Sequence, residues 1–553
     1  MKMKVYLTTG ASVLALAAVA AVGTGASAHQ IYYPYRPGAV HTAPTAELRH
    51  IGAYEKPYVA PKKSKTGTWA DLSGALPFAN GPWNPKQMTD GTILVLDYCT
   101  ASGQWYKLTP DKKGQYSDGT WSKIATMPSG YSPLFFASQV LPDTGNFIVN
   151  GGEYNAPTGS CDGDWTNKGA LYNYTANTWS TVTAPSGWAS IGDAESIVLP
   201  DGSYMLADCC DEANAIATIS GTTVTWTTTG TGKADDDDEE GWTNLPEAQG
   251  GDVFDVDTWK LNATGDNYEL YNPTKGTWTS QGYTPDILTE TSTRELGPAP
   301  LTPAYGSEGT IVQFSANTTK GVNDIYDVAS NKFTSGPVMT DNGTVYDVAD
   351  GPAATEPNGK ILVDASPGTF DYPSHFWEWT INKKGKISIA MTSDNKTSSS
   401  TSSFEGNLMV IPTGQIIWDN SQTTPNEVAL YTPVGKAKKA WLPVVSSVSA
   451  TLKAGSTGNA ISGTNFNGFD MGGSYGDDAQ ESTNWPLVRI TNTKSGDVCF
   501  GRSYDFSTMG VWTTGTTSAE FDLPKKGCDT GASTLQVIVN GIASAGTSVT
   551  ISK

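Results

Sequence analysis

Long apolar runs are scarce in this chain of 553 residues. The most marked one, Ala11–Val22, is too short to span a bilayer, and no later segment approaches the 18 apolar residues expected of a membrane helix. Basic residues are also few: 35 Lys and Arg stand against 55 Asp and Glu, which gives a formal net charge of −20. Such a chain repels polyanions, and no basic patch is visible that would bind one. The composition therefore predicts no membrane span and no nucleic-acid partner.

Histidine is rare, with four copies, and only His375 lies beyond residue 50. One imidazole in the body of the chain cannot build a metal site that needs two. Charged residues make up only 16% of the chain, while Gly, Ser, Thr and aromatic residues are abundant. This composition is typical of turn-rich β structure.

The first 28 residues have the organisation of a secretory signal. Lys2 and Lys4 precede the apolar stretch, and Ala26-Ser27-Ala28 forms a small-x-small cleavage site. We therefore predict residues 1–28 as a signal peptide and expect a secreted or periplasmic protein. Residues 29–65 are rich in proline and without periodicity, and we expect an extended leader there.

Six cysteines in an exported chain indicate disulfides. Cys499 and Cys528 both lie near the C-terminus, and we predict that they pair with each other. The adjacent Cys209 and Cys210 could form a vicinal disulfide or bond to cysteines of neighbouring loops. The pairing therefore stays open for four residues: Cys99, Cys161, Cys209 and Cys210.

A repeat of about 50 residues runs from Thr66 to about residue 443. Its first half is an apolar strand, an Asp-Gly-like turn and a second apolar strand, as in SIVLPDGSYMLAD (196–208). Its second half closes on Thr-Trp, as in LYNYTANTWSTV (171–182). The spacing is typical of four-stranded kelch blades and predicts an all-β, seven-bladed propeller over 66–443. GTWADL (67–72) lacks a first half, so we expect it to supply the outer strand of the last blade.

The blade repeat ends and the sequence pattern changes after Val445. Short alternating strands separated by turn residues fill the last part of the chain, which ends in STLQVIVNGIASAGTSVTIS. These features predict an immunoglobulin-like β-sandwich over 444–553. A disulfide between Cys499 and Cys528 would stabilise it.

The segments ISGTNFNGF, YGDDAQ, NWPLVRITN and RSYDFSTMGV, placed after the propeller repeats, resemble those of the galactose oxidase-like family of secreted bacterial kelch proteins. The resemblance covers most of the mature chain. It implies a copper radical site with a Tyr-Cys cross-link, a Tyr-His pair and a further histidine on a C-terminal loop. It also implies that this loop reaches the axis of the propeller and completes the site.

The sequence departs from that pattern at each decisive point. No Tyr-His pair exists, and the expected C-terminal loop, RSYDFSTMG (502–510), carries Tyr504 and Asp505 in place of a histidine. His375, in PSHFWEW, is expected to be a hydrogen-bonded strand residue. We therefore expect the scaffold of the family without its copper chemistry.

Carboxylates recur just before the first strand of five of the predicted blades. Glu240, Glu295, Asp350 and Glu405 follow one another at steps of 55 residues, and Glu240 ends the acidic run of KADDDDEEGW (233–242). Because these positions share one face of a propeller, they predict an acidic mouth at its axis. The expected ligand-binding set also contains Asp193, Glu195, Asp208, Glu239, Arg294 and Trp242, while Tyr504 and Asp505 are expected beside the catalytic candidates Glu240, Glu295, Asp350 and Glu405.

Two interpretations of this ring compete. Acidic residues at strand ends can bond the backbone amides of neighbouring blades, and Asp235–Asp237 can be a plain solvated loop. Alternatively, clustered carboxylates raise one another's pKa and require a cation. Calcium, which takes six to eight oxygen ligands, is then the expected ion at Glu240, Glu295 and Asp350. Trp242 could stack against a sugar or belong to the core.

Four functions follow from these features. The first is an exported propeller that binds a glycan, a cell-envelope polymer or a cation at its acidic face. The second is a carbohydrate-processing enzyme, of the glycoside hydrolase or lyase type, that uses paired carboxylates. The third is a structural surface or matrix protein. The fourth, a copper radical oxidase, conflicts with the scarcity of histidine.

Overall fold

The structure is a computed structural model that describes residues 66–141, 144–159, 161, 165–290, 294–317, 319–420, 426–476 and 478–553. The predicted signal peptide (1–28) and leader (29–65) lie outside the described residues. Among the described residues, no helix is long and apolar enough to cross a membrane.

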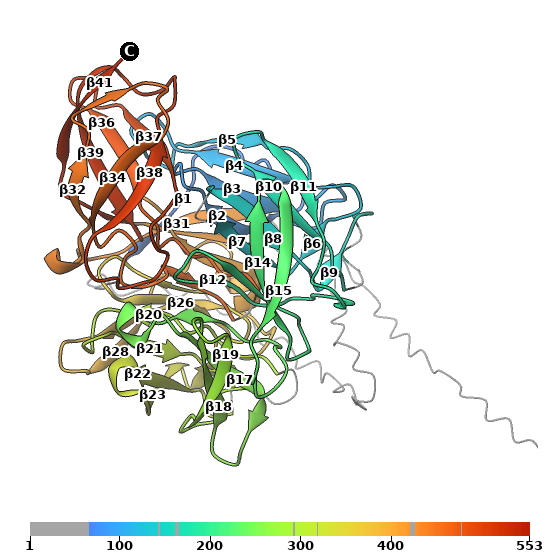
Figure 1. Cartoon of the computed structure of the whole chain (residues 1–553). Coiled ribbons are helices and arrows are strands. Elements are labelled where there is room, and N and C mark those ends of the chain that lie inside the picture. The colour runs from blue at the N-terminus through green and yellow to red at the C-terminus, as the bar shows by residue number, and fades with distance from the viewer. Residues whose placement is uncertain are drawn as a thin grey trace, which may run out of the picture. The chain divides into compact units, whose positions relative to one another are not determined.

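Seven four- or five-stranded sheets follow one another along the described chain as the blades of a β-propeller (Figure 1). Blade 1 consists of β2 (Pro82–Gln87), β3 (Ile93–Asp97), β4 (Trp105–Thr109) and β5 (Thr120–Lys123). Blade 2 consists of β7 (Ala137–Leu141), β8 (Asn146–Asn150), β10 (Gly169–Asn173) and β11 (Thr178–Val182). Blade 3 consists of β12 (Ser196–Val198), β13 (Tyr204–Ala207), β14 (Asn214–Ser220) and β15 (Thr223–Thr229). Blade 4 consists of β16 (Thr243–Asn244), β17 (Val253–Leu261), β18 (Asp266–Asn272) and β19 (Thr277–Tyr283).

Two of the remaining three blades include a strand from elsewhere in the chain. Blade 5 consists of β20 (Leu301–Thr302), β21 (Thr310–Gln313), β22 (Val322–Asp327), β23 (Lys332–Asp341) and β24 (Thr344–Tyr346). Blade 6 consists of β25 (Ala353–Thr355), β26 (Ile361–Ala365), β27 (His375–Ile381) and β28 (Ile387–Met391), and β35 (Gly473–Ser474) adds to β25. Blade 7 consists of β29 (Gly406–Val410), β30 (Ile416–Asn420), β31 (Glu427–Thr432) and β1 (Thr68–Asp71).

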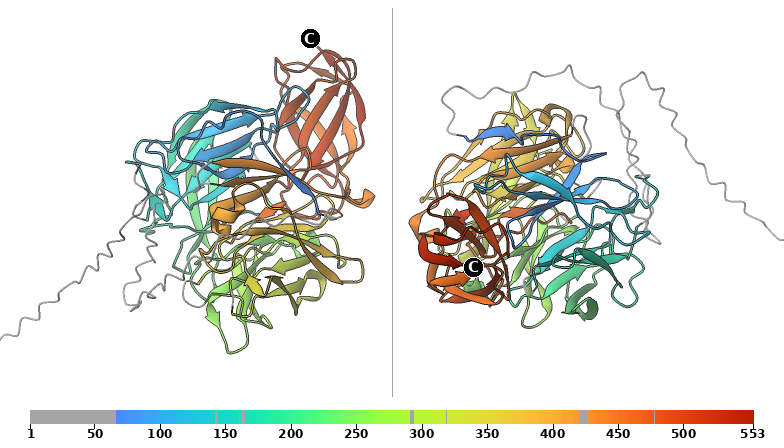
Figure 2. Two further views of the ribbon diagram at one scale, coloured as in Figure 1. Left: turned by 180° about the vertical axis from the view of Figure 1, so that it is seen from behind. Right: turned by 90° about the horizontal axis from the view of Figure 1, so that it is seen from above.

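Strand β1 closes the propeller, as the sequence predicts. It pairs antiparallel with β31, and Trp69 lies opposite Tyr431 (Figures 1 and 2). The Trp69 ring contacts Phe376 and Tyr431, with ring centroids 4.5 and 4.9 Å apart. The outer strand of the last blade therefore comes from the beginning of the described chain, and the first and last blades are held in one closed ring.

The hydrophobic core is divided among the interfaces between neighbouring blades. Ile93 and Tyr106 of blade 1 cluster with Met409 and Leu430 of blade 7, for example. Middle strands such as β3 (ILVLD) are buried on both faces, while the outer strand β5 (TWSK) is largely exposed. The continuous apolar strands of the repeat are therefore those that lie between two blades, as expected for strands covered on both sides.

The C-terminal strands form a single bent sheet. Its strands are β32 (Val444–Val448), β33 (Thr451–Lys453), β34 (Asn459–Thr464), β36 (Leu487–Asn492), β37 (Val498–Tyr504), β38 (Thr517–Asp522), β39 (Gly531–Val539) and β41 (Thr547–Ser552), with β40 (Ile542–Ala543) beside β39. The first part of β37 pairs with β36, whereas its end pairs with β38. The predicted Cys499–Cys528 disulfide is confirmed and lies in this domain.

The C-terminal domain contacts the propeller on the face that carries the turns between first and second strands. Ser503 N donates to Thr89 O at 3.1 Å, and Met509 N donates to Pro200 O at 2.9 Å. Arg502 Nη1 donates to Thr144 O at 2.6 Å. The acidic positions of the repeat precede the first strands, and they therefore lie toward the opposite face.

One hairpin of the C-terminal domain, residues 470–484, enters the ring of first strands. We call it the channel hairpin; residue 477 within it is not described. Its strand β35 pairs with β25, and Lys86 Nζ of β2 donates to Gln480 O at 2.6 Å. Tyr475 Oη donates to Phe404 O, just before β29, at 2.9 Å. Contacts with three separate blades place this hairpin along the axis of the propeller.

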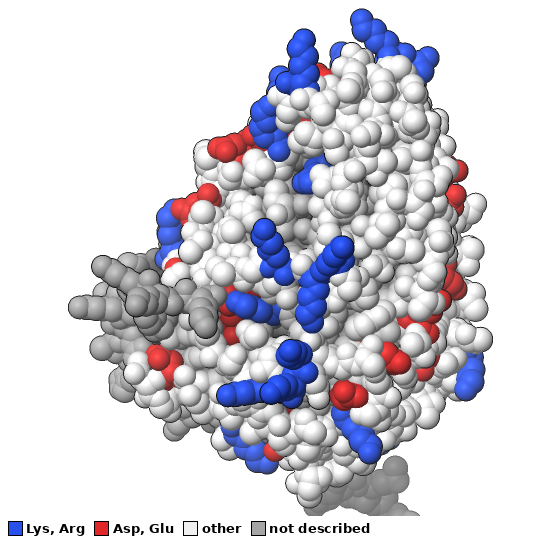
Figure 3. Space-filling view, turned by 90° about the vertical axis from the view of Figure 1, so that its left-hand side faces the viewer, with Lys and Arg blue, Asp and Glu red and all other residues white. Residues whose placement is uncertain are grey.

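The acidic composition does not translate into an evenly acidic surface. Figure 3 shows one face on which Lys and Arg side chains gather near the middle, while Asp and Glu are scattered around them. Many carboxylates are instead buried, among them Asp237, Glu240, Asp255, Glu295 and Asp364. A large share of the acidic side chains therefore lies inside the protein.

Candidate functional site

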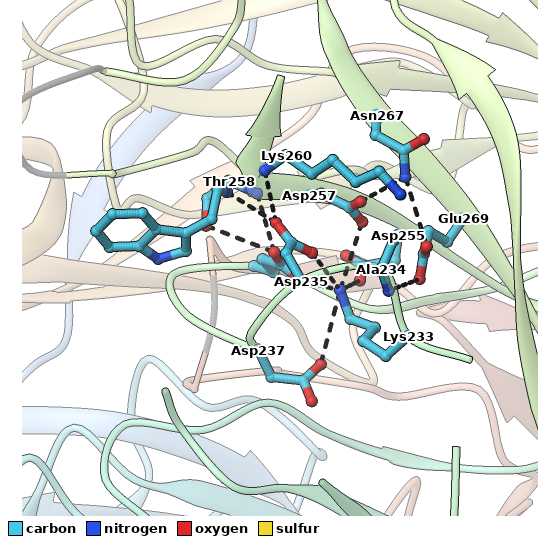
Figure 4. A network of polar contacts seen from close by, with 12 residues as sticks. Lys233, Ala234, Asp235, Asp237, Asp255, Asp257, Thr258, Lys260, Asn267 and Glu269 are labelled. Carbon is cyan, nitrogen blue, oxygen red and sulfur yellow. Dashed lines mark hydrogen bonds and ion pairs between the residues drawn. The ribbon is translucent and has the colours of Figure 1, made fainter. Parts of the chain in front are cut away.

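The acidic run KADDDDEEGW begins with its own counter-ion. Lys233 is fully buried, and its Nζ lies 2.9 Å from Glu240 and 3.2 Å from both Asp235 and Asp255 (Figure 4). Asp257 and Asp237 complete the group at 3.4 and 3.9 Å. We call these six residues the Lys233 cluster. Three of its carboxylates come from the run itself, and two come from β17.

The Lys233 cluster is a structural ion network. Burial alone would lower the pKa of Lys233, but the surrounding carboxylates outweigh it and raise that pKa well above its ordinary value. Burial also raises the pKa of Glu240, of Asp237 and of Asp257. One ammonium group lies among five buried carboxylates, and burial opposes the charged form of Glu240, Asp237 and Asp257. This part of the acidic run is neither solvated nor open to a ligand.

A second group lies at the axis: Glu239, Glu295 and Asp350, which we call the axial cluster. One carboxylate oxygen from each residue lies within 4.8 Å of those of the other two. Glu295 is buried, with 4% of its surface exposed, whereas Glu239 and Asp350 are partly exposed. Glu239 and Asp350 have left-handed backbone, with φ of 59° and 46°. Residues other than glycine seldom adopt this conformation, and such strain tends to gather at functional sites.

Further carboxylates surround the axial cluster. Burial raises the pKa of Glu295 well above its ordinary value, and Asp350, Asp193, Asp238 and Glu153 raise it further. Burial, followed by Asp238 and Asp478, also raises the pKa of Asp193 to about 7. The strongest charges acting on Glu295 are thus other carboxylates rather than an ammonium group.

One buried carboxylate oxygen of Glu295 accepts no hydrogen bond from the described residues. Among the described residues, no donor reaches its buried Oε2, and no Lys or Arg forms an ion pair with this side chain. A buried acceptor without a partner is energetically unfavourable, and a buried charge more so. Converging carboxylate oxygens in a partly open position are the arrangement that a divalent cation binds.

Glu240 is not part of the axial cluster, contrary to the prediction. The 55-residue step points to Glu240, but Glu240 faces Lys233 and also accepts from Thr258 N at 2.9 Å. Its neighbour Glu239 occupies the predicted place beside Glu295 and Asp350. Glu195 accepts from Glu240 N at 3.1 Å and so lies beside the Lys233 cluster.

Tyr504 and Asp505 do not lie beside the carboxylates either. Tyr504 Oη donates to Asp522 at 2.8 Å, within the C-terminal domain, and Asp505 is exposed. Their loop follows the turn face of the propeller. A C-terminal segment does reach the axis, but it is the channel hairpin, whose Asp478 acts on Asp193 and Glu153.

Several other predicted ligand residues have structural partners. Trp242 is completely buried and packs against Trp278 at 5.6 Å, so it belongs to the core. Arg294 lies 4.4 Å over the Trp259 ring. Glu405 accepts from Ser402 N at 3.0 Å in a capping box, and burial raises its pKa to about 7. Asp208 is buried, which raises its pKa to about 7, and it directly precedes Cys209.

Other carboxylates at strand ends bond backbone amides, as the structural interpretation of the ring predicts. Asp97 accepts from Ala79 N and Asn80 N, both at 3.0 Å, and Asp419 accepts from Asn407 N at 3.0 Å. His375 Nδ1 lies 3.0 Å from Asp394, in agreement with the expected hydrogen-bonded strand histidine. The predicted ring is therefore divided between backbone bonding, an internal ion network and the axial cluster.

Two residues near the mouth, Lys233 and Asp478, were not predicted to contribute to it. Lys233 stands at the head of the acidic run, and Asp255 and Asp257 occur two residues apart in one strand, so both could have indicated an internal ion network. Asp478 lies in YGDDAQ, one of the segments that carry the family resemblance. Trp259, a tryptophan expected in or near the loops of this face, donates from Nε1 to Asp238 at 2.6 Å.

Comparisons with known proteins do not assign an activity. No family model matches the chain, and no curated protein matches it. Among solved structures, a fungal alcohol oxidase of the AA5 family in complex with copper is 14% identical, with a TM-score of 0.37 and 85% of each chain covered. Streptogramin B lyase is 8% identical, with a TM-score of 0.41 over 66% of this chain and 98% of its own. YCF48 bound to a D1 peptide is 11% identical, with a TM-score of 0.41 over 68% of this chain and 98% of its own.

Proposed function

We propose that the protein binds a divalent cation, calcium in the first place, at the axial cluster. The observation that carries the proposal is the contrast between the two acidic groups. The Lys233 cluster contains an ammonium group at its centre. Glu295 has an unpartnered buried oxygen among the described residues, and its strongest electrostatic neighbours are carboxylates. A cation from solution would supply the charge that a lysine supplies in the first group.

The spacing suits calcium. The oxygens of the three residues lie within 4.8 Å of one another, and 4.8 Å is the largest separation that two ligands of one ion can have at a Ca–O distance of about 2.4 Å. Glu239, Glu295 and Asp350 offer up to six oxygens if each binds through both, and water can complete the shell. Magnesium requires near-octahedral geometry and usually keeps several waters, so it suits a group of three carboxylates less well.

The rest of the chain supports a location in which such a site would meet calcium. A kelch-type propeller with an immunoglobulin-like C-terminal domain, exported by the signal at residues 1–28, would present this site outside the cytoplasm. Free calcium is abundant there, so a weak extracellular-type site would be occupied. The two disulfides agree with such a location.

Isothermal titration of the metal-free full chain with calcium tests the proposal. We expect one bound ion per chain in the parent. Glu295→Gln and Asp350→Asn keep the side-chain shape but remove one charge each, and each is expected to weaken binding at least tenfold, or about 1.4 kcal/mol.

Asp505→Asn is the matched control, because it removes one negative charge from an exposed position of the C-terminal domain. It should bind calcium like the parent. The proposal fails if the parent binds no divalent cation, or if Glu295→Gln and Asp505→Asn affect binding equally. A higher melting temperature of Glu295→Gln without any calcium effect would show a purely structural cluster.

A further inference from the structure

Cys209 and Cys210 lie at the rim of the acidic mouth. They follow β13 and Asp208, and Cys210 Sγ lies 3.2 Å from Asp238 Oδ1. Asp238 directly precedes Glu239 of the axial cluster. Cys209 is buried, and Cys210 is partly exposed. The pair is thus placed where a molecule in solution can reach one of the two residues.

The backbone brings both sulfur atoms to one side. Consecutive side chains of an extended strand point in opposite directions. Here Cys210 has left-handed backbone, with φ of 72°, and the two Sγ atoms lie only 2.6 Å apart. The peptide bond between them is trans, since the cis bond of the described residues is Tyr372–Pro373.

This separation does not suit a shared metal ion. Two thiolates on one tetrahedral zinc, with Zn–S bonds of 2.3 Å, lie about 3.8 Å apart. Thiolates are also disfavoured here, because burial and the neighbouring Asp193 and Asp238 raise the pKa of Cys209 well above its ordinary value. A neutral disulfide adds no charge to this acidic surrounding.

The other cysteines are already paired. Cys99 bonds to Cys161, and Cys499 bonds to Cys528. These bonds account for four of the six cysteines of the chain. The alternatives in which Cys209 or Cys210 bonds to Cys99 or Cys161 are therefore wrong. Within the chain, each of the two can pair only with the other.

We propose that Cys209 and Cys210 form a reversible vicinal disulfide, a thiol-exchange site at the rim of the mouth. Two thiols react with an external disulfide such as oxidised glutathione, so that one Sγ–Sγ bond forms, the external S–S bond breaks, and the two protons and two electrons pass to two released thiols. The reverse reaction begins with attack of an external thiolate on the more exposed Cys210. The inference does not depend on cation binding.

Covalent geometry makes this bond easier to reduce than the other two. Consecutive Cα atoms lie about 3.8 Å apart across a trans peptide. Ordinary disulfides join Cα atoms at about 4.4–6.8 Å, and departures from this range store strain and make the bond more reducible. The Cα atoms of Cys99–Cys161 and Cys499–Cys528 are 5.6 and 5.2 Å apart. A mild reductant should therefore open the vicinal bond first.

Peptide mapping of the full chain tests the proposal. Trypsin releases residues 169–233 as one peptide, which contains both cysteines and no other. The protein is incubated with oxidised glutathione, unfolded in guanidinium with iodoacetamide, and digested. We expect this peptide without label and lighter by two hydrogen atoms than the dithiol form. Full labelling of the peptide should need at least tenfold less reductant than labelling at Cys99 or Cys499.

The variant Cys210→Ser serves as the control. Its Cys209 should take one label or one glutathione under the same conditions, which shows that the absence of label in the parent is due to a bond and not to burial. Two labels in the oxidised parent would overturn the proposal. So would a stable glutathione adduct in the parent, or labelling that becomes possible only after a chelator removes zinc.

Discussion

Glu239 and Glu240 are consecutive residues, but their carboxylates belong to two different groups. Glu240 lies 2.9 Å from Lys233, and Glu239 converges with Glu295 and Asp350. The left-handed backbone at Glu239 accompanies this division. A single acidic run thus supplies both a buried ion network and one side of a partly open site, and substitutions in the run should separate the two roles.

Lys233→Met is expected to destabilise the protein strongly. The substitution keeps an unbranched apolar chain but leaves five buried carboxylates without their ammonium group. Breaking a buried ion pair from one side costs about 3–5 kcal/mol. Thermal unfolding should show a large decrease in melting temperature, whereas Lys275→Met, at an exposed position, should change it little.

A compensating variant distinguishes charge from packing. If repulsion among the carboxylates causes the loss of stability in Lys233→Met, adding Asp237→Asn and Asp257→Asn to this variant should recover much of it. If the triple variant is no more stable than Lys233→Met, the lysine acts through its packing against Trp278, whose ring lies 5.6 Å from Nζ.

The two tryptophans of the acidic region should behave differently when replaced by alanine. Trp242 is completely buried, and its loss leaves a large cavity that costs about 3–5 kcal/mol. Trp259 is partly exposed, so Trp259→Ala should cost less than half as much. Denaturant unfolding measures both values. Equal losses would contradict the assignment of Trp242 to the core and Trp259 to the mouth.

The propeller was predictable because its signals are local and repeated. Each blade carries an apolar strand, a turn glycine such as Gly91 or Gly414 with positive φ, and a second apolar strand. The closing strand could also be predicted, since GTWADL matches the outer strand of the repeat but is not preceded by the first half of a repeat unit. The pairing of Trp69 with Tyr431 confirms it.

The side-chain directions at the mouth were not predictable in the same way. Spacing located the acidic positions to within one residue, but left-handed backbone at Glu239 decides which carboxylate faces the axis. The channel hairpin was missed because its placement depends on contacts between residues far apart in the chain, such as Lys86 with Gln480. Neither Tyr504 nor its loop carries a local signal of which face of the propeller it meets.

Trp69→Ala should weaken the closure of the ring. The side chain contacts Phe376 and Tyr431 and is the main apolar residue of β1. We expect a loss of about 2–4 kcal/mol and faster hydrogen exchange in β31, because β1 is its hydrogen-bonded neighbour.

Trp226→Ala, in the outer strand β15 of blade 3, is the matched control for this substitution. It removes a similar ring that packs against a cluster formed by residues of blades 2–5 and the C-terminal domain. Hydrogen exchange followed by mass spectrometry should show its effect in β14 and leave β31 unchanged. An equal effect of both variants on β31 would mean that closure does not depend on Trp69.

Asp470, at the start of the channel hairpin, should make stability depend on pH. It is buried and accepts from Gly472 N at 2.8 Å and from Asn540 Nδ2 at 2.9 Å. Burial raises its pKa from about 4 to about 7. In the unfolded chain the pKa is lower, so the folded state binds more protons between these values. The contribution of Asp470 is therefore fully present below about pH 4 and is lost as the pH rises through 7.

Asp470→Asn removes this titration and keeps an oxygen that accepts both hydrogen bonds. Near pH 4 the variant should melt close to the parent. As the pH rises, the variant should become more stable than the parent. The difference in the free energy of unfolding should level off above pH 7, at no more than about 4 kcal/mol for a shift of three pKa units. Melting curves at several pH values, with Asp505→Asn as an exposed control, measure the difference. A constant difference across this range would show that Asp470 titrates normally, and that the channel hairpin does not contain a carboxyl destabilised by burial.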